Sequence, residues 1–83
     1  MEIGTVIGAV WATRKAEHLG GLALLVVDTP QGHRVAADDL GAGVGDRVLL
    51  TFGSGARMNC PNAPIDAAVT AILDERGTTY VRP

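Results

Sequence analysis

A run of closely spaced glycines, Gly41-Ala42-Gly43-Val44-Gly45-Asp46, is the first segment whose residue types suggest chemistry. Glycine-rich loops bind phosphates when they join a strand to the N-terminus of a helix, because backbone N–H groups then converge on the anion. Here the aliphatic run Val48-Leu49-Leu50 follows, which is typical of a strand, and the glycine spacing does not match a dinucleotide fingerprint. We therefore interpret the segment as a corner between two strands.

Ser54, the one serine in the segment Gly53-Ser54-Gly55, does not stand in a nucleophile elbow. That motif requires a glycine two residues before the serine, and Phe52 occupies the position. Asp38, Asp39 and Asp46 flank the glycine-rich corner, where turn capping is a commoner role for a carboxylate than acid–base catalysis. We predict no catalytic residues, no cofactor and no enzymatic activity.

Histidine and cysteine residues do not form a metal-binding pattern. His18, His33 and Cys60 lack the short paired spacings of zinc sites, so we predict no metal site. Because Cys60 is the only cysteine, no disulfide forms within the chain, and we interpret it as a structural free thiol. The stretch 58–63 around it receives no role.

The elements that position these residues are short and rich in Val, Ile and Leu, with Gly, Pro and Asp between them. We predict strands at residues 1–13, 22–27, 33–38, 47–52 and 69–73, the second and third joined by a hairpin turn at 28–32. Residues 53–63 are expected to form an irregular loop. Pro64 followed by alanines predicts a short helical turn over 64–68. The prediction is a single, mainly all-β domain, 1–83, folded as a small, mainly antiparallel five-stranded barrel.

The first, second and fourth predicted strands are apolar on both faces, although a small barrel has only one interior. Apolar residues make up 47% of the 83 residues, an excess for so small a core. Another copy of the chain is the natural cover for the second face. Burial of apolar surface at roughly 25 cal/mol per Å² would then stabilise the small domain, so we predict an obligate homo-oligomer.

Charge and aromatic content weigh against a nucleic-acid-binding barrel. Arg14, Lys15, Arg34, Arg47 and Arg57 are candidates for a basic stripe. However, the formal net charge is −2 and aromatic residues are only 4% of the chain, whereas single-strand-binding barrels use aromatic side chains to stack bases. No apolar run reaches the ~20 residues of a membrane span, and Met1-Glu2-Ile3 does not begin a basic leader. We expect a cytoplasmic protein that binds neither nucleic acid nor membrane.

Several segments, taken in order, resemble the EutN/CcmL family of bacterial microcompartment vertex proteins. They are Thr13-x-Lys15-x-x-x-Leu19-x-Gly21-x-x-Leu24-Leu25-x-Val27, Val35-Ala36-Ala37-Asp38, Gly41-Ala42-Gly43-x-Gly45-Asp46-x-Val48-Leu49, Gly53-Ser54-x-Ala56-Arg57 and Pro64-Ile65-Asp66-Ala67-Ala68-Val69-x-Ala71-Ile72-Leu73-Asp74. Each segment alone is weakly specific, but their ordered combination from the first strand to Asp74 is specific. The resemblance implies a five-stranded, OB-fold-like barrel assembled as a pentamer. Such a pentamer would close the five-fold vertices of a carboxysome or a catabolic microcompartment, beside hexameric shell proteins.

Within that resemblance, two groups of residues are candidates for assembly. Small residues let five backbones approach an axis, so the candidate pore loop is Gly53, Ser54 and Gly55. The candidates for subunit contacts or for fixing that loop are Arg57, Asp66, Asp38 and Trp11. The alternative function is an OB-like barrel that binds single-stranded nucleic acid or a small ligand.

Overall fold

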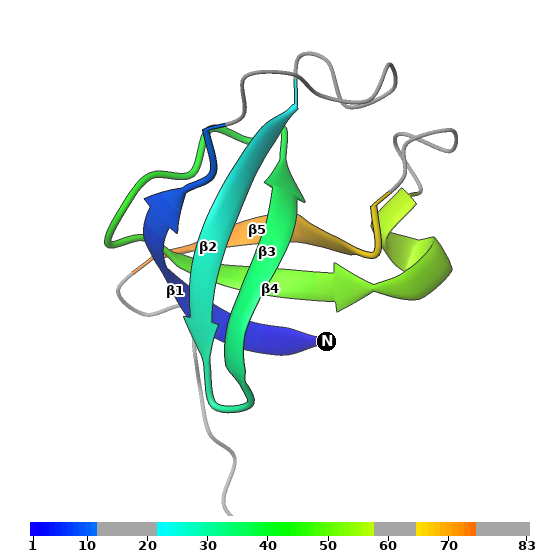
Figure 1. Ribbon diagram of the computed structural model, residues 1–83. Coiled ribbons are helices and arrows are strands. Elements are labelled where there is room, and N and C mark those ends of the chain that lie inside the picture. Colours follow the sequence, from blue (N-terminus) through cyan, green and yellow to red (C-terminus); the bar gives the residue numbers. More distant parts are fainter. Residues whose placement is uncertain (12–21, 58–64, 75–83) are drawn as a thin grey trace, which may run out of the picture.

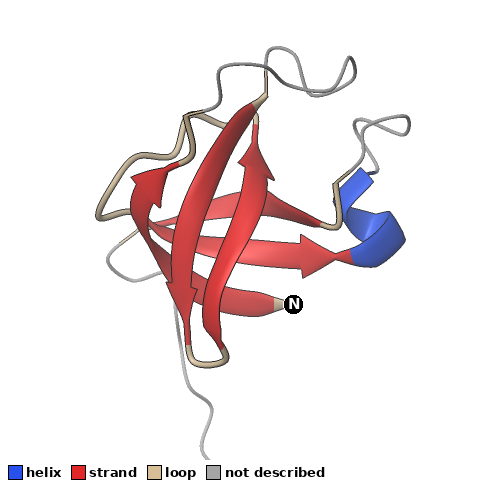
Figure 2. Cartoon of the chain, in the orientation of Figure 1, coloured by secondary structure: helices blue, strands red, loops and turns tan. Residues whose placement is uncertain are grey.

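The computed structural model describes residues 1–11, 22–57 and 65–74, which form one closed barrel (Figure 1). The strands are β1 (Glu2–Ala9), β2 (Ala23–Thr29), β3 (Gly32–Asp38), β4 (Arg47–Phe52) and β5 (Ala67–Leu73). Around the barrel they follow the order β1-β2-β3-β5-β4. Figure 2 shows that the helical part of this region is the 3-10 turn η2 (Gly53–Arg57), between β4 and β5. The predicted fold class, a mainly β five-stranded barrel with one short helical turn, is confirmed.

Strand β1 belongs to both walls of the barrel. Its first half, Glu2 to Thr5, pairs with β4, and its second half, Thr5 to Ala9, pairs with β2. A β-bulge between Val6 and Gly8 bends the strand from one wall to the other, as bulges commonly do at barrel corners. In Figure 1, β2 and β3 cross in front of β4 and β5, so β1 links two opposite walls.

The core is built from small aliphatic side chains on alternate strand positions. Val6, Val27, Val48 and Leu50 are at most 1% exposed, and Leu25, Ala36, Ala67 and Val69 complete the cluster. Because neighbouring strand residues point to opposite faces, the residues between these positions point outward. The aromatic side chains in the described part lie outside this cluster: Trp11 is 92% exposed and Phe52 is 36% exposed.

One end of the barrel interior is occupied by an ion pair. Arg34 pairs across strands with buried Val27, and Glu2 pairs with buried Leu50, so both side chains are on the inner face. Arg34 Nε donates to Glu2 Oε1 at 3.1 Å, and the guanidinium lies 5.8 Å from the centre of the Phe52 ring. The pair therefore connects β3 to β1 across the end of the barrel, where β3 and β5 separate.

The seam between β3 and β5 is the weakest part of the closure. These two strands are parallel and share the single pair Ala37–Ala68, whereas the other four pairings are antiparallel and longer. The prediction of a mainly antiparallel barrel holds with this one exception. A hairpin turn cannot join two parallel strands. The chain therefore passes from β3 to β5 through β4 and the turn that follows β4.

The predicted strand ends need small corrections. The hairpin at 28–32 is confirmed, but its first strand continues to Thr29 and its second begins at Gly32. The Thr29 hydroxyl stabilises this tighter turn, because it donates to the Gly32 carbonyl and accepts from the Gln31 N–H. Strand β1 ends at Ala9 rather than at residue 13. Val10 still donates to the Leu24 carbonyl, and residues 12 and 13 lie outside the described part.

The predicted position of the helical turn was wrong. Ala67 and Ala68 lie in β5, paired with Phe52 and Thr51, and no helix begins at Ile65 or Asp66. The turn is instead at Gly53–Arg57, inside the segment predicted to be an irregular loop. Gly53, at φ +64°, begins the turn in a left-handed conformation directly after β4. Ala67 and Ala68 form the β4–β5 ladder instead of a helix.

Candidate functional site

The turn η2 presents three small residues at one end of the barrel (Figure 1). Gly53, Ser54 and Gly55 are all exposed, whereas Ala56 is 6% exposed and anchors the turn. The Gly53 N–H donates to the Asp66 carbonyl at 2.8 Å, which holds the start of the turn against the chain entering β5. The candidate pore loop, Gly53 to Gly55, is thus an exposed arc that one backbone hydrogen bond holds at its first residue.

Arg57 and Asp66 lie on the two segments that this contact joins, but their side chains do not form an ion pair. Arg57 Nη1 donates to the Ile65 carbonyl at 2.8 Å. The first and last residues of the turn therefore donate to two consecutive carbonyls before β5, those of Asp66 and Ile65. The Asp66 side chain itself is exposed. The structure places Arg57 where it fixes the turn and leaves the Asp66 carboxylate at the surface.

Asp38 caps the connection that follows β3. It is 4% exposed, and its carboxylate accepts hydrogen bonds from the N–H groups of Leu40, Gly41 and Ala42 at 2.9–3.1 Å. Asp46 likewise accepts from Gly43 N–H at 2.9 Å. The two carboxylates cap the glycine-rich connection, in which Gly41 and Gly45 have positive φ. The corner interpretation is confirmed, because β4 follows this segment directly, and the capping interpretation is confirmed for Asp38 and Asp46. Asp39 is exposed.

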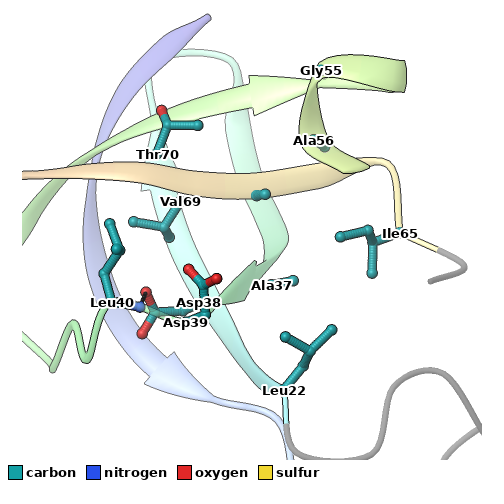
Figure 3. A pocket seen from close by; sticks show the side chains of 11 residues that line it. Leu22, Ala37, Asp38, Asp39, Leu40, Gly55, Ala56, Ile65, Val69 and Thr70 are labelled. Carbon is teal, nitrogen blue, oxygen red and sulfur yellow. Dashed lines mark hydrogen bonds between the residues drawn. The ribbon is translucent and has the colours of Figure 1, made fainter. Parts of the chain in front are cut away.

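A hollow of about 160 Å³ brings Asp38 close to the turn (Figure 3). It lies between the ends of β3 and β5, with Leu22 and Ile65 on one side and Leu40 and Val69 on the other. Gly55 and Ala56 of η2 also line it. Of the residues predicted for assembly, Asp38 and Gly55 line this hollow. Trp11 lies apart, at the end of β1, with its side chain almost fully exposed.

The other chemical candidates remain dispersed. Arg34 is in the barrel end, Arg57 binds the Ile65 carbonyl and Arg47 begins β4 on the outer surface, so these three do not form a stripe. Within residues 1–11, 22–57 and 65–74, no cluster of His, Cys, Asp and Glu is suited to a metal ion. No helix in the described part is long and apolar enough to cross a membrane. His18 and Cys60 lie outside the described residues.

The outer surface of the barrel carries several aliphatic side chains beside polar ones. Side chains that project outward include Ile7 at 46%, Val35 at 52% and Val44 at 73% exposure, while Ile3, Leu24, Val26 and Leu49 are half-buried. The sequence prediction of a second apolar face is confirmed for β1 and β2, whereas on β4 the outward Leu49 follows the polar Arg47. Sequence reasoning did not predict the Glu2–Arg34 pair, because residues 32 positions apart carry no local signal of their contact.

Exposed aliphatic side chains that are grouped on a small closed barrel are typical of a surface that contacts another protein. A protein-family model described as "Ethanolamine utilisation protein EutN/carboxysome" matches residues 1–74. The chain belongs to this EutN/CcmL family.

Curated relatives carry the same assignment. The shell vertex protein PduN of Salmonella typhimurium is 41% identical, over 89% of this chain and 96% of its own. The carboxysome shell vertex protein CcmL of Synechococcus elongatus is 43% identical, over 89% of this chain and 84% of its own. These relatives are structural shell proteins rather than enzymes, and the chain is a shell protein of the same kind.

Solved structures of similar proteins have the same fold over almost the whole of this chain. The pentameric microcompartment shell protein GrpN of Rhodospirillum rubrum superposes with a TM-score of 0.82 at 39% identity, covering 96% of this chain and all of its own. A pentameric shell protein of the RMM microcompartment reaches 0.84 at 36% identity, covering 99% of this chain and 100% of its own. Both similar structures are described as pentameric.

Proposed function

We propose that this chain forms a homopentamer that closes the five-fold vertices of a bacterial microcompartment shell in the cytoplasm. The observation that carries the proposal is the set of aliphatic side chains on the outer surface of the barrel. Val35, for example, is 52% exposed in the single chain. Exposed apolar patches on a small domain mark association sites, and similar shell proteins are pentameric. Hexameric shell proteins are the partners that such a vertex would contact along its rim.

The mass of the protein in solution tests the assembly. Five copies of the 8.6 kDa chain give a particle of about 43 kDa, which light scattering coupled to size exclusion distinguishes from a monomer. We expect the 43 kDa species at micromolar concentration. A stable species of 8.6 kDa at that concentration would rule out the pentamer.

We propose further that Gly53, Ser54 and Gly55 line the five-fold axis. The arc is exposed and carries no side chain larger than serine, so five copies have room to approach one another. Arg57 supports it from behind through the Ile65 carbonyl, and Asp66 does so through its own carbonyl. Asp38 shapes the hollow beneath the arc, while Trp11, far from it, is available for a neighbouring subunit.

Cysteine cross-linking tests the position of the arc. In a Cys60→Ala background, Ser54→Cys places five thiols around the proposed axis, close enough for disulfides if their Cα atoms lie within ~7 Å. Mild oxidation should then give covalent dimers of subunits on a non-reducing gel. Gln31→Cys, exposed at the tip of the β2–β3 hairpin, is the control and should give none. A 43 kDa Ser54→Cys pentamer without cross-links would place the arc away from the axis.

A further inference from the structure

A polar row divides the outer surface of the barrel. Thr5 pairs with Asp28 on one side and with Arg47 on the other, and Asp28 pairs with His33, so the row crosses β3, β2, β1 and β4. His33 Nε2 lies 3.6 Å from Asp28 Oδ1, and both side chains are more than half exposed. We call these four residues the polar belt. It carries an acidic group at β2 and a basic group at β4.

Two separate apolar patches flank this belt. The first, the β4 patch, is the cross-strand row Ile3, Leu49 and Ala71, on β1, β4 and β5. The second, the β3 patch, consists of Val26 and its partner Val35 with Ile7 at the bulge of β1. Because β2 and β3 lie on the opposite wall from β4 and β5, the two patches face different directions (Figure 1).

Two different patches on different walls suit a ring rather than a two-fold dimer. An isologous dimer uses the same patch twice, whereas a cyclic pentamer joins the front of each subunit to the back of the next. A two-fold contact through the β4 patch would cover that patch on both copies but leave the β3 patch of each copy exposed. Head-to-tail contact covers both patches.

Charge also favours the head-to-tail arrangement. Arg47 lies two residues before Leu49 and borders the β4 patch, while Asp28 lies two residues after Val26 and borders the β3 patch. When one patch covers the other with these borders aligned, Arg47 meets the border that carries Asp28 and His33. Complementary rims of this kind fix the orientation of an interface and disfavour the wrong pairing.

We infer that the β4 patch of each subunit packs on the β3 patch of its neighbour, with Arg47 beside the neighbour's acidic belt residue. This inference rests on the proposed pentamer and specifies which surfaces form it. Leu49 and Val35 are then the central contacts of the two halves of one interface. Each subunit uses both patches, and the ring closes without leaving either exposed.

Complementation between two variants tests the assignment. Leu49→Glu disables the β4 patch and leaves the β3 patch intact, and Val35→Glu does the reverse. Each variant alone should lose the 43 kDa species and elute as a monomer of 8.6 kDa. Mixed in equal amounts, they share one intact interface, so we expect a heterodimer of about twice the monomer mass. Gln31→Glu, on the exposed hairpin tip, is the matched control and should remain pentameric.

The outcomes separate the inference from the proposed function. A wild-type protein that is monomeric overturns both. A pentameric wild type with a pentameric Leu49→Glu or Val35→Glu variant, or a mixture that stays monomeric, overturns only the patch assignment. Circular dichroism checks that each variant is folded. If Leu49→Glu unfolds, Ala71→Glu on the same patch replaces it, with the same two expected results.

Discussion

At the scale of single residues, Gly4 shows how closely β1 approaches β2. A Cβ at this position would lie 2.6 Å from the Asp28 carbonyl oxygen and 2.6 Å from Val27 Cγ1. Neither atom is the end of a flexible side chain, so the strands would have to separate. The absence of a side chain is therefore required for the tight curvature of the barrel at this point.

We expect Gly4→Ala to lower the free energy of unfolding by about 1–3 kcal/mol, as overpacking typically does. Gly8→Ala is the matched control on the same strand, because a Cβ there meets no atom within 4 Å. Chemical denaturation of both variants measures the difference. Equal stabilities for the two variants would contradict the close approach at Gly4.

Asp38 allows a second prediction at this scale. Asp38→Ala removes the acceptor of three backbone N–H groups in the connection to β4, and should cost about 1–3 kcal/mol of stability. Asp39→Ala changes the neighbouring, exposed carboxylate and should leave stability nearly unaltered. Thermal unfolding compares the two. If Asp39→Ala were the more damaging variant, the capping role of Asp38 would be refuted.

At the scale of elements, η2 depends on the conformation of its first residue. Gly53 has φ +64°, which costs other residues roughly 1–2 kcal/mol, whereas no positive φ occurs at Gly55. Gly53→Ala should therefore destabilise the turn and speed amide hydrogen exchange over residues 53–57. Gly55→Ala, where a Cβ meets nothing within 4 Å, should leave exchange unchanged. Faster exchange in Gly55→Ala than in Gly53→Ala would contradict this account.

Strands were predictable from the sequence because their signals are local. Alternating or continuous Val, Ile and Leu runs, bounded by residues such as Pro30, Gly32 and Gly45, placed all five strands to within a few residues. The apolar second face was predictable for the same reason, since strand periodicity assigns each side chain to a face. The Asp38 cap followed from its position beside flexible glycines.

Features that depend on distant pairing were not predictable. The helical turn was expected after Pro64, but Ala67 and Ala68 complete the β4 ladder, and tertiary pairing overrides their local propensity. The parallel contact between Ala37 and Ala68 arises only when the barrel closes. Arg57 and Asp66 were predicted only as candidates for fixing the loop or for subunit contacts; the atoms that form the contacts, the Arg57 guanidinium with the Ile65 carbonyl and the Asp66 carbonyl with the Gly53 N–H, depend on how the two segments meet.

At the scale of the whole molecule, the aliphatic surface couples stability to association. If folding and ring formation are linked, tenfold dilution removes about 1 kcal/mol per subunit, by mass action. For a domain of this size the Tm should then fall by about 4–8 °C. Calorimetry over a range of concentrations measures the shift. Leu49→Glu should show a Tm that does not depend on concentration, and an equal dependence in both proteins would contradict the linkage.

The bend of β1 has a mechanical consequence for a closed ring. Ile3 belongs to one patch and Ile7 to the other, so a single strand joins the two interfaces of each subunit within five residues. Outward pressure on a shell stretches a vertex ring along its circumference. In the proposed ring that tension crosses each subunit through the covalent backbone of β1, and the sparse β3–β5 seam is not required to resist it.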